Sequence, residues 1–212
     1  MLLPNMTLEE VRREIDKDSP IVLRKAGYMA IKARRAMRPK GDKYIHSMYE
    51  YVSKHRNHWI CRLEVEKRIM RNYCMAYYYA KRGIAGIGLL CNSEWLMYYT
   101  SHFFKRFNER QKLNIVLPND LLWRFMEQFG DFAIEKDEQI SEEVWSVFCV
   151  TDKGIMLGIA DYKRKFYRMN TYLAPEMLKT TQIETGVRLR MKLMLHELDK
   201  VKCDWQAFLD RQ

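Results

Sequence analysis

Glycine and proline are scarce in this sequence, with 9 and 5 residues among 212. Since these two residues mark most turns, their scarcity favours a compact, helix-rich protein over an all-β one. Hydrophobic residues make up 48% and charged residues 30% of the chain, which is an ordinary globular balance and argues against a largely disordered protein. The length allows one domain with a sizeable core, or two small domains.

Cysteines are few, odd in number and widely spaced, and no Cys-x-x-Cys occurs. They are Cys61, Cys74, Cys91, Cys149 and Cys203. This pattern argues against a disulfide scaffold and favours reduced thiols in a cytoplasmic protein. Long apolar runs are also missing, so we expect neither a signal peptide at the start nor a membrane span. The dinucleotide fingerprint, the P-loop spacing and Gly-x-Ser-x-Gly are absent, and no cofactor is expected.

Acidic residues do not balance the basic ones, and the formal net charge is +10. The basic excess is concentrated over residues 21–43, whereas residues 119–143 are acidic. A basic surface predicts an anionic partner, here RNA or another polyanion. The predicted contact residues in the basic segment are Arg24, Lys32, Arg34, Arg35 and Arg38. Ordinary solvated helix faces are the alternative interpretation.

Residues 1–85 are predicted to form a basic, helical region. A capping box at Thr7 and Glu10 predicts one helix start, and Ser19 followed by Pro20 predicts a second. Pro39 and Gly41 then predict a break in the chain. Residues 43–82 contain no proline or glycine, and we expect one long helix there, or two with a bend near residues 55–58.

Residues 86–212 are predicted to form an α+β domain, because short apolar clusters alternate with turn signals there. The predicted strands are 87–91, 95–99, 144–151, 155–160 and 166–173, the first two forming a hairpin. Helices are predicted from a cap at Thr100 or Ser101, from Pro118 or Asn119 to just before Gly130, and at the C-terminal end, with an interruption near Gly186. Strands joined by short turns indicate a small antiparallel sheet with helices on one face.

The strongest candidate for chemistry is YYTSHFFKRFNER, residues 98–110. On a helix, Arg106 and Arg110 follow His102 within an arc of about 80°, beside a wholly aromatic stripe. His102 falls in the first turn, where the helix dipole favours a neutral imidazole that can accept a proton. The arginines can bind phosphate in bidentate fashion. These residues are the parts for metal-independent RNA cleavage, although a polar helix face paired with local carboxylates is the alternative.

This stretch, a strand running into His-x-x-x-Arg-x-x-x-Arg, resembles a motif of uncharacterised bacterial proteins. It is also distantly similar to ribonuclease-toxin domains of the RelE/ParE kind, and the order of elements over residues 87–180 resembles that fold. The resemblance implies an RNA-directed domain whose active face carries basic and aromatic side chains. It assigns His102, Arg106 and Arg110 by motif. Tyr167 and Arg168, on the last predicted strand, are candidates by location.

Two other groups of residues are weaker signals. His55, His58, Cys61 and Glu64 are spaced by three, but on a helix such steps drift apart, so no metal site is predicted. MRNYCMAYYYAKR, residues 70–82, mixes tyrosines with basic residues and could stack bases, although packing is the more typical use. Besides the enzyme, two hypotheses stay open: a non-catalytic nucleic-acid-binding or regulatory protein, and a protein whose Met-rich and aromatic helices dock a partner or a second copy.

Overall fold

The computed structural model describes residues 1–40, 44–66, 70–90, 93–128 and 132–209, and side chains within them except at 38–40, 193 and 196–209. The described strands are β1 (Tyr44–Val52), β2 (His58–Glu66), β3 (Met70–Ala80), β4 (Gly83–Leu89), β5 (Leu96–Tyr99), β6 (Ala133–Ser141), β7 (Val144–Val150), β8 (Ile155–Asp161) and β9 (Phe166–Leu173). The described helices are α1 (Leu8–Lys40), α2 (Ser101–Arg110), α3 (Pro118–Gln128) and α4 (Thr180–Leu209), with a 3₁₀ turn at Pro175–Met177.

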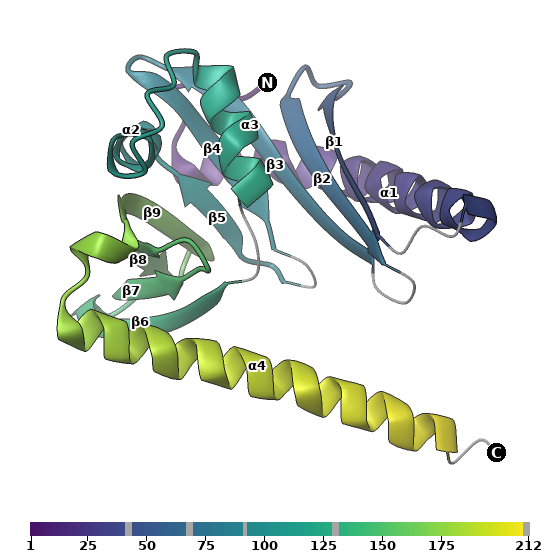
Figure 1. Cartoon of the computed structure of the whole chain (residues 1–212). Helices are drawn as coiled ribbons and strands as arrows, with labels where there is room; N and C mark the ends of the chain where they lie inside the picture. Colours follow the sequence, from purple (N-terminus) through teal and green to yellow (C-terminus); the bar gives the residue numbers. More distant parts are fainter. Residues whose placement is uncertain (41–43, 67–69, 91–92, 129–131, 210–212) are drawn as a thin grey trace.

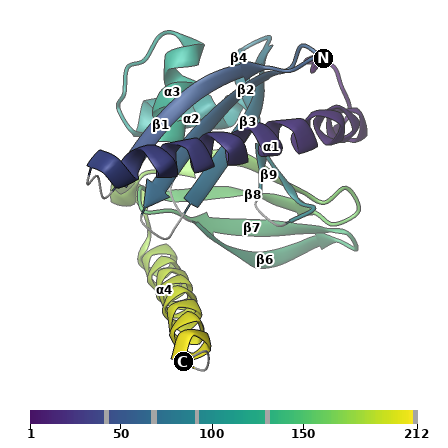
Figure 2. The same ribbon diagram turned by 90° about the vertical axis from the view of Figure 1, so that its right-hand side faces the viewer.

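All the described strands belong to one sheet, in the order β1-β2-β3-β4-β5-β9-β8-β7-β6. Neighbouring strands are antiparallel except β5 and β9, which are parallel. The helix α1 crosses one face of the sheet, and α2 and α3 cover the other (Figure 2). The fold is therefore α+β, as predicted, but the nine-stranded sheet is larger than the small sheet expected, and helices lie on both of its faces.

The helix α1 begins at the predicted capping box. The backbone N–H of Thr7 donates to Glu10 Oε2 at 2.8 Å, and that of Glu10 donates to Thr7 Oγ1 at 3.3 Å. The predicted second start at Ser19 and Pro20 is wrong, because the helix continues to Lys40. Pro20 removes one backbone hydrogen bond, but the apolar face continues on both sides of it and is buried against the sheet. The buried residues of this face include Val11, Ile15, Val22 and Ala26.

The prediction that residues 43–82 are helical is wrong, since β1, β2 and β3 occupy most of this segment as antiparallel strands. The turn between β1 and β2 needs neither glycine nor proline, because Arg56 adopts a positive φ of 62°. Ser53 Oγ accepts hydrogen bonds from the backbone N–H groups of His55 and Asn57 and fixes this turn. Five successive residues of β2, 59–63, are buried, so no polar–apolar alternation marks it as a strand.

The prediction for the second half of the chain is largely confirmed. β4 and β5 form the expected hairpin, α2 and α3 follow it, and β7, β8 and β9 are the three predicted strands. β6 was missed because it is a charged edge strand with little apolar content. The predicted interruption of α4 at Gly186 is wrong, since the helix runs through this residue, which lies over Val150. Gly130 lies outside the described residues.

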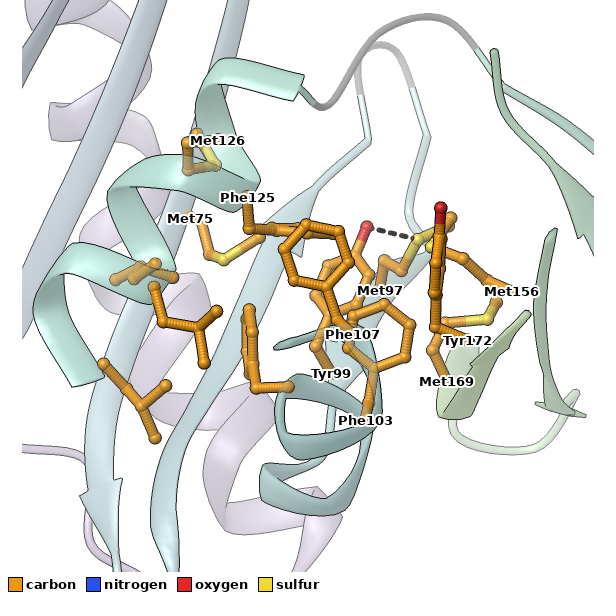
Figure 3. Packing of buried hydrophobic residues seen from close by; sticks show 14 of the residues in the cluster. Met75, Met97, Tyr99, Phe103, Phe107, Phe125, Met126, Met156, Met169 and Tyr172 are labelled. Atoms are coloured by element: carbon orange, nitrogen blue, oxygen red, sulfur yellow. Dashed lines mark hydrogen bonds between the residues drawn. The ribbon is translucent and has the colours of Figure 1, made fainter. Parts of the chain in front are cut away.

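An aromatic cluster packs α2 and α3 against the sheet (Figure 3). The ring of Phe125 on α3 lies 5.0 Å from that of Tyr99, 5.6 Å from Phe103 and 5.3 Å from Phe107. The predicted aromatic stripe of α2 is thus confirmed as the buried side of this helix. Within the described part of the chain, no helix combines the length and the apolar character needed to cross a membrane.

Candidate anion-binding site at the start of α2

The start of α2 is held against β9 by Thr100. The Thr100 side chain caps the helix by accepting a hydrogen bond from the Phe103 N–H at 3.1 Å. Its hydroxyl and its backbone N–H both donate to the carbonyl of Met169, each at 3.3 Å. The first helical turn, with His102 in it, is therefore fixed beside the middle of β9. The N–H groups of this turn point away from the helix and are suited to an anion.

The parallel pairing of β5 and β9 brings Tyr98 opposite Arg168. One residue further along β9 the pairing with β8 is irregular, because Gly158 pairs with Met169 and Leu157 with Thr171. Asn170 is therefore an extra residue in β9, which is the arrangement of a β-bulge. Bulges bend a strand and redirect its side chains, and this one lies next to Arg168.

Gly158 on β8 allows β9 to approach closely at this bulge. A Cβ atom at position 158 would lie 2.1 Å from the Arg168 carbonyl oxygen, which is impossible without a backbone shift. The position of Arg168 thus depends on a glycine in the neighbouring strand.

An open hollow of about 720 Å³ lies where these elements meet. His102, Arg168, Lys81 and Arg82 line it, and no Asp or Glu of the described residues does. The other lining residues are Pro4, Tyr78, Ala80, Ala85, Tyr98, Thr100, Ser101 and Asn170. Two guanidinium groups, one ammonium group and one imidazole therefore surround a space that no carboxylate of the described residues lines, which favours an anionic ligand.

Two tyrosine hydroxyls add hydrogen-bonding groups to the hollow. The hydroxyls of Tyr78 and Tyr98 lie 2.8 Å apart, so one donates to the other and the second proton is available to a ligand. Burial raises the pKa of Tyr78, and the hydrogen bond to Tyr98 raises it further, while Arg168 acts in the opposite direction. Tyr78 is therefore protonated at neutral pH.

The structure separates the three residues of the predicted helix motif. His102 lines the hollow, but Arg106 and Arg110 do not. Arg106 Nη1 donates to Glu109 Oε2 at 2.9 Å on the surface of α2. Arg110 Nη1 donates to the Tyr172 carbonyl and, at 3.2 Å, to Thr171 Oγ1, so it fastens the end of α2 to β9. The structure brings His102 together with Arg168, which the sequence suggested by location alone.

The other predicted nucleic-acid contacts lie on α1. Arg24, Lys32 and Arg35 are exposed and Arg34 is half-buried. The side chain of Arg38 lies outside the described residues. None of these residues lines the hollow, and within the described residues no carboxylate forms an ion pair with the four that are described. Arg24, Lys32 and Arg35 lie within about 40° of Tyr28 around the helix axis and form a second basic surface with this side chain, which is 66% exposed.

Some lining residues were missed or ranked low from the sequence. Tyr78, Lys81 and Arg82 belong to a stretch whose mixture of aromatic and basic residues was noted, but packing was favoured there. Tyr98 belongs to the stretch 98–110 but was not singled out within it, and Asn170 carried no signal, since the pairing of β5 with β9 and the bulge bring them to the hollow.

The group His55, His58, Cys61 and Glu64 lies along β2 and the turn before it, not on a helix. His55 Nδ1 lies 2.5 Å from Asp18 Oδ1, and Cys61 is buried on the side of the sheet covered by α1. Among the residues that the structure describes, no three His, Cys, Asp or Glu side chains cluster as a metal site would require.

Comparison with known proteins adds no identification. No protein-family model matches this chain, and neither the curated proteins nor the solved structures contain a significant match. The resemblance to RelE-like domains is therefore still a prediction.

Proposed function

We propose that this protein binds RNA, with a phosphate group in the hollow between His102 and Arg168. The observation that carries the proposal is the composition of the hollow, in which four basic side chains meet and which no carboxylate in the described part of the chain lines. Protonated hydroxyls and the first N–H groups of α2 supply hydrogen-bond donors to phosphate oxygens. The proposal includes a cytoplasmic location, which is supported by the buried, unoxidised thiols of Cys61 and Cys149.

The basic surface of α1 is the second contact region in this proposal. Arg24 lies twenty residues after Pro4, which lines the hollow, and most of the intervening chain is helical. At the rise of an α-helix this separation is about 30 Å. An RNA chain must be extended over this length to contact both regions, so the α1 residues would contribute to the affinity for long RNA and not for short RNA.

Metal-independent RNA cleavage is the second candidate, because a general base and a phosphate-binding guanidinium line the same hollow. In this mechanism His102 acts as the general base and removes the proton from a 2′-hydroxyl, whose oxygen attacks the adjacent phosphorus. Arg168 stabilises the negative charge that develops on the phosphoryl oxygens, and the 5′-oxygen leaves with a proton from the Tyr78–Tyr98 pair or water. Arg168 takes the place that the sequence predicted for Arg106 and Arg110.

The test is binding of a labelled single-stranded RNA, measured by fluorescence anisotropy over a range of salt concentrations in excess EDTA. Arg168→Ala removes one phosphate contact and is expected to weaken binding. It should also reduce the slope of log affinity against log salt concentration by about 0.7 in magnitude. Arg106→Ala is the matched control and should leave both unchanged, since Arg106 pairs with Glu109 outside the hollow. If wild-type protein shows no binding at low salt, the proposal is wrong.

The same samples decide between binding and cleavage. RNA products that form in EDTA with wild-type protein and disappear with His102→Ala would support the catalytic mechanism. Intact RNA together with measurable affinity would leave the binding function and reject cleavage of the RNA tested.

A further inference from the structure

The helix α4 presents an apolar surface that the body of the protein does not cover. Leu189 packs against Phe148, Val150 and Ile155, and Arg188 pairs with Glu135 at the start of the helix. Beyond these contacts α4 runs away from the sheet (Figure 1). On its exposed side lie Ile183, Val187, Met191, Met194 and Leu195, between 48% and 66% exposed.

The spacing of these residues is that of a helix that packs along another helix. Val187, Met191 and Met194 are separated by four and three residues, the a/d spacing of a coiled coil. The sequence continues this spacing with four more apolar residues, so that the whole stripe from residue 187 to residue 208 spans about three heptads. These four are Leu198, Val201, Trp205 and Phe208. A period of 3.5 residues keeps the apolar side facing a partner helix over its whole length.

We propose that the partner is α4 of a second copy of this chain, and that the two helices pair in parallel. The charges beside the apolar stripe are mixed in sign and do not require a partner of opposite net charge. With Met191 and Leu198 at a positions, Glu197 falls at g and Lys202 at e. In two parallel helices in register, a g position lies opposite the e position five residues further along the partner, so the sequence places opposite charges at these two positions.

The arrangement of the body on α4 is compatible with this pairing. Leu189 lies on the side of the helix opposite the stripe, so the sheet domain occupies the outer side of each helix. Two parallel copies therefore place their sheet domains on opposite sides of the helix pair. Such a dimer carries two copies of the hollow, although the inference about α4 does not depend on what the hollow binds.

The experiment is the molar mass of the full chain in solution, measured by light scattering after gel filtration over a range of concentrations. Wild-type protein is expected at twice the mass of one chain, and Met191→Glu/Met194→Glu at the mass of one. The matched control is Thr185→Glu/Lys192→Gln, which changes the net charge by the same amount on the other side of α4 and should leave the mass doubled. Circular dichroism of each variant checks that the domain is folded.

Orientation is tested separately with Val187→Cys. In a parallel pair the two d positions face each other, so mild oxidation should give a covalent dimer on a non-reducing gel, beyond any formed by wild-type protein. A single-chain mass for wild-type protein at all concentrations, or a doubled mass in the methionine variant, would overturn the proposal. A dimer that gives no additional cross-link at position 187 would overturn the parallel orientation.

Discussion

Replacing Asp18 by alanine would remove the carboxylate that joins α1 to the turn between β1 and β2. The Asp18 side chain is fully buried. Its Oδ2 accepts hydrogen bonds from Asn57 Nδ2 at 2.7 Å and Trp59 Nε1 at 3.3 Å, and its Oδ1 lies 2.5 Å from His55 Nδ1. The carboxylate therefore has specific partners on three residues of the turn and of β2.

The cost of Asp18→Ala follows from the donors that lose their acceptor. Asn57 and Trp59 are 1% and 0% exposed, so water does not replace the carboxylate without rearrangement of the core. A buried donor without a partner costs about 1–3 kcal/mol, and the variant should lose about 3–5 kcal/mol of unfolding free energy. This is a large part of the total of about 5–15 kcal/mol typical for a folded protein.

The contribution of Asp18 should also depend on pH. Burial raises the pKa of Asp18, but hydrogen bonds from Ser53, His55, Asn57 and Trp59 outweigh burial, and the pKa is lowered. A lowered pKa in the folded state means that the stabilisation is complete above the unfolded-state pKa of about 4 and is lost as the pH falls below it. Asp18→Asn should lack this component of acid sensitivity.

Urea unfolding at pH 7 and pH 3.5, followed by tryptophan fluorescence, measures both effects. Asp16→Ala is the control on the same helix, because the Asp16 side chain is 59% exposed and lies 4.0 Å from Arg12. An exposed pair of this kind is worth less than about 1 kcal/mol. If the Asp18 and Asp16 variants unfold at the same urea concentration, the buried carboxylate does not stabilise the fold as described.

Three further predictions concern the packing of α2, α3, β8 and β9. Phe125→Ala should lower stability by about 3–5 kcal/mol and reduce the melting temperature, because it opens a cavity in the aromatic cluster. Gly158→Ala should lower both stability and RNA affinity, since its Cβ would lie 2.1 Å from the Arg168 carbonyl oxygen, and unchanged affinity would contradict this role. Arg110→Ala should cost about 1–3 kcal/mol of stability through lost hydrogen bonds to β9, whereas Arg106→Ala should change it by less than about 0.5 kcal/mol in a thermal unfolding assay.

Local signals in the sequence predicted the elements whose ends are marked by particular residues. Thr7 with Glu10, and Thr100 before the aromatic stripe, marked the starts of α1 and α2 correctly. The hairpin of β4 and β5 and the meander of β7, β8 and β9 were marked by turns. The strands β2 and β3 were missed because their runs of buried residues remove the alternation of polar and apolar residues. β1 is an edge strand whose residues are all half-buried or exposed, and neither proline nor glycine marks its turn to β2.

The site was only partly predictable, because its residues are brought together by strand pairing between distant segments. His102 could be found from its place at the start of a helix, and Arg168 from its strand. That Arg168 and not Arg106 lies beside His102 depends on the parallel register of β5 with β9 and on the bulge at Asn170. The spacing of Arg106 and Arg110 predicts their places on α2 correctly, but it does not reveal that Glu109 and the end of β9 bind them.

The parallel pairing of β5 with β9 also determines when the hollow can form during synthesis. Tyr99 on β5 pairs with Met169 on β9. After β5 has left the ribosome, about seventy more residues must therefore follow before β9 can pair with the edge of β5 that β4 does not cover. At about 5–20 residues per second this takes several seconds, during which β1–β5 present an open strand edge. The hollow that holds His102 is therefore absent from a nascent chain that ends before β9, and it forms only when both halves of the sheet are present.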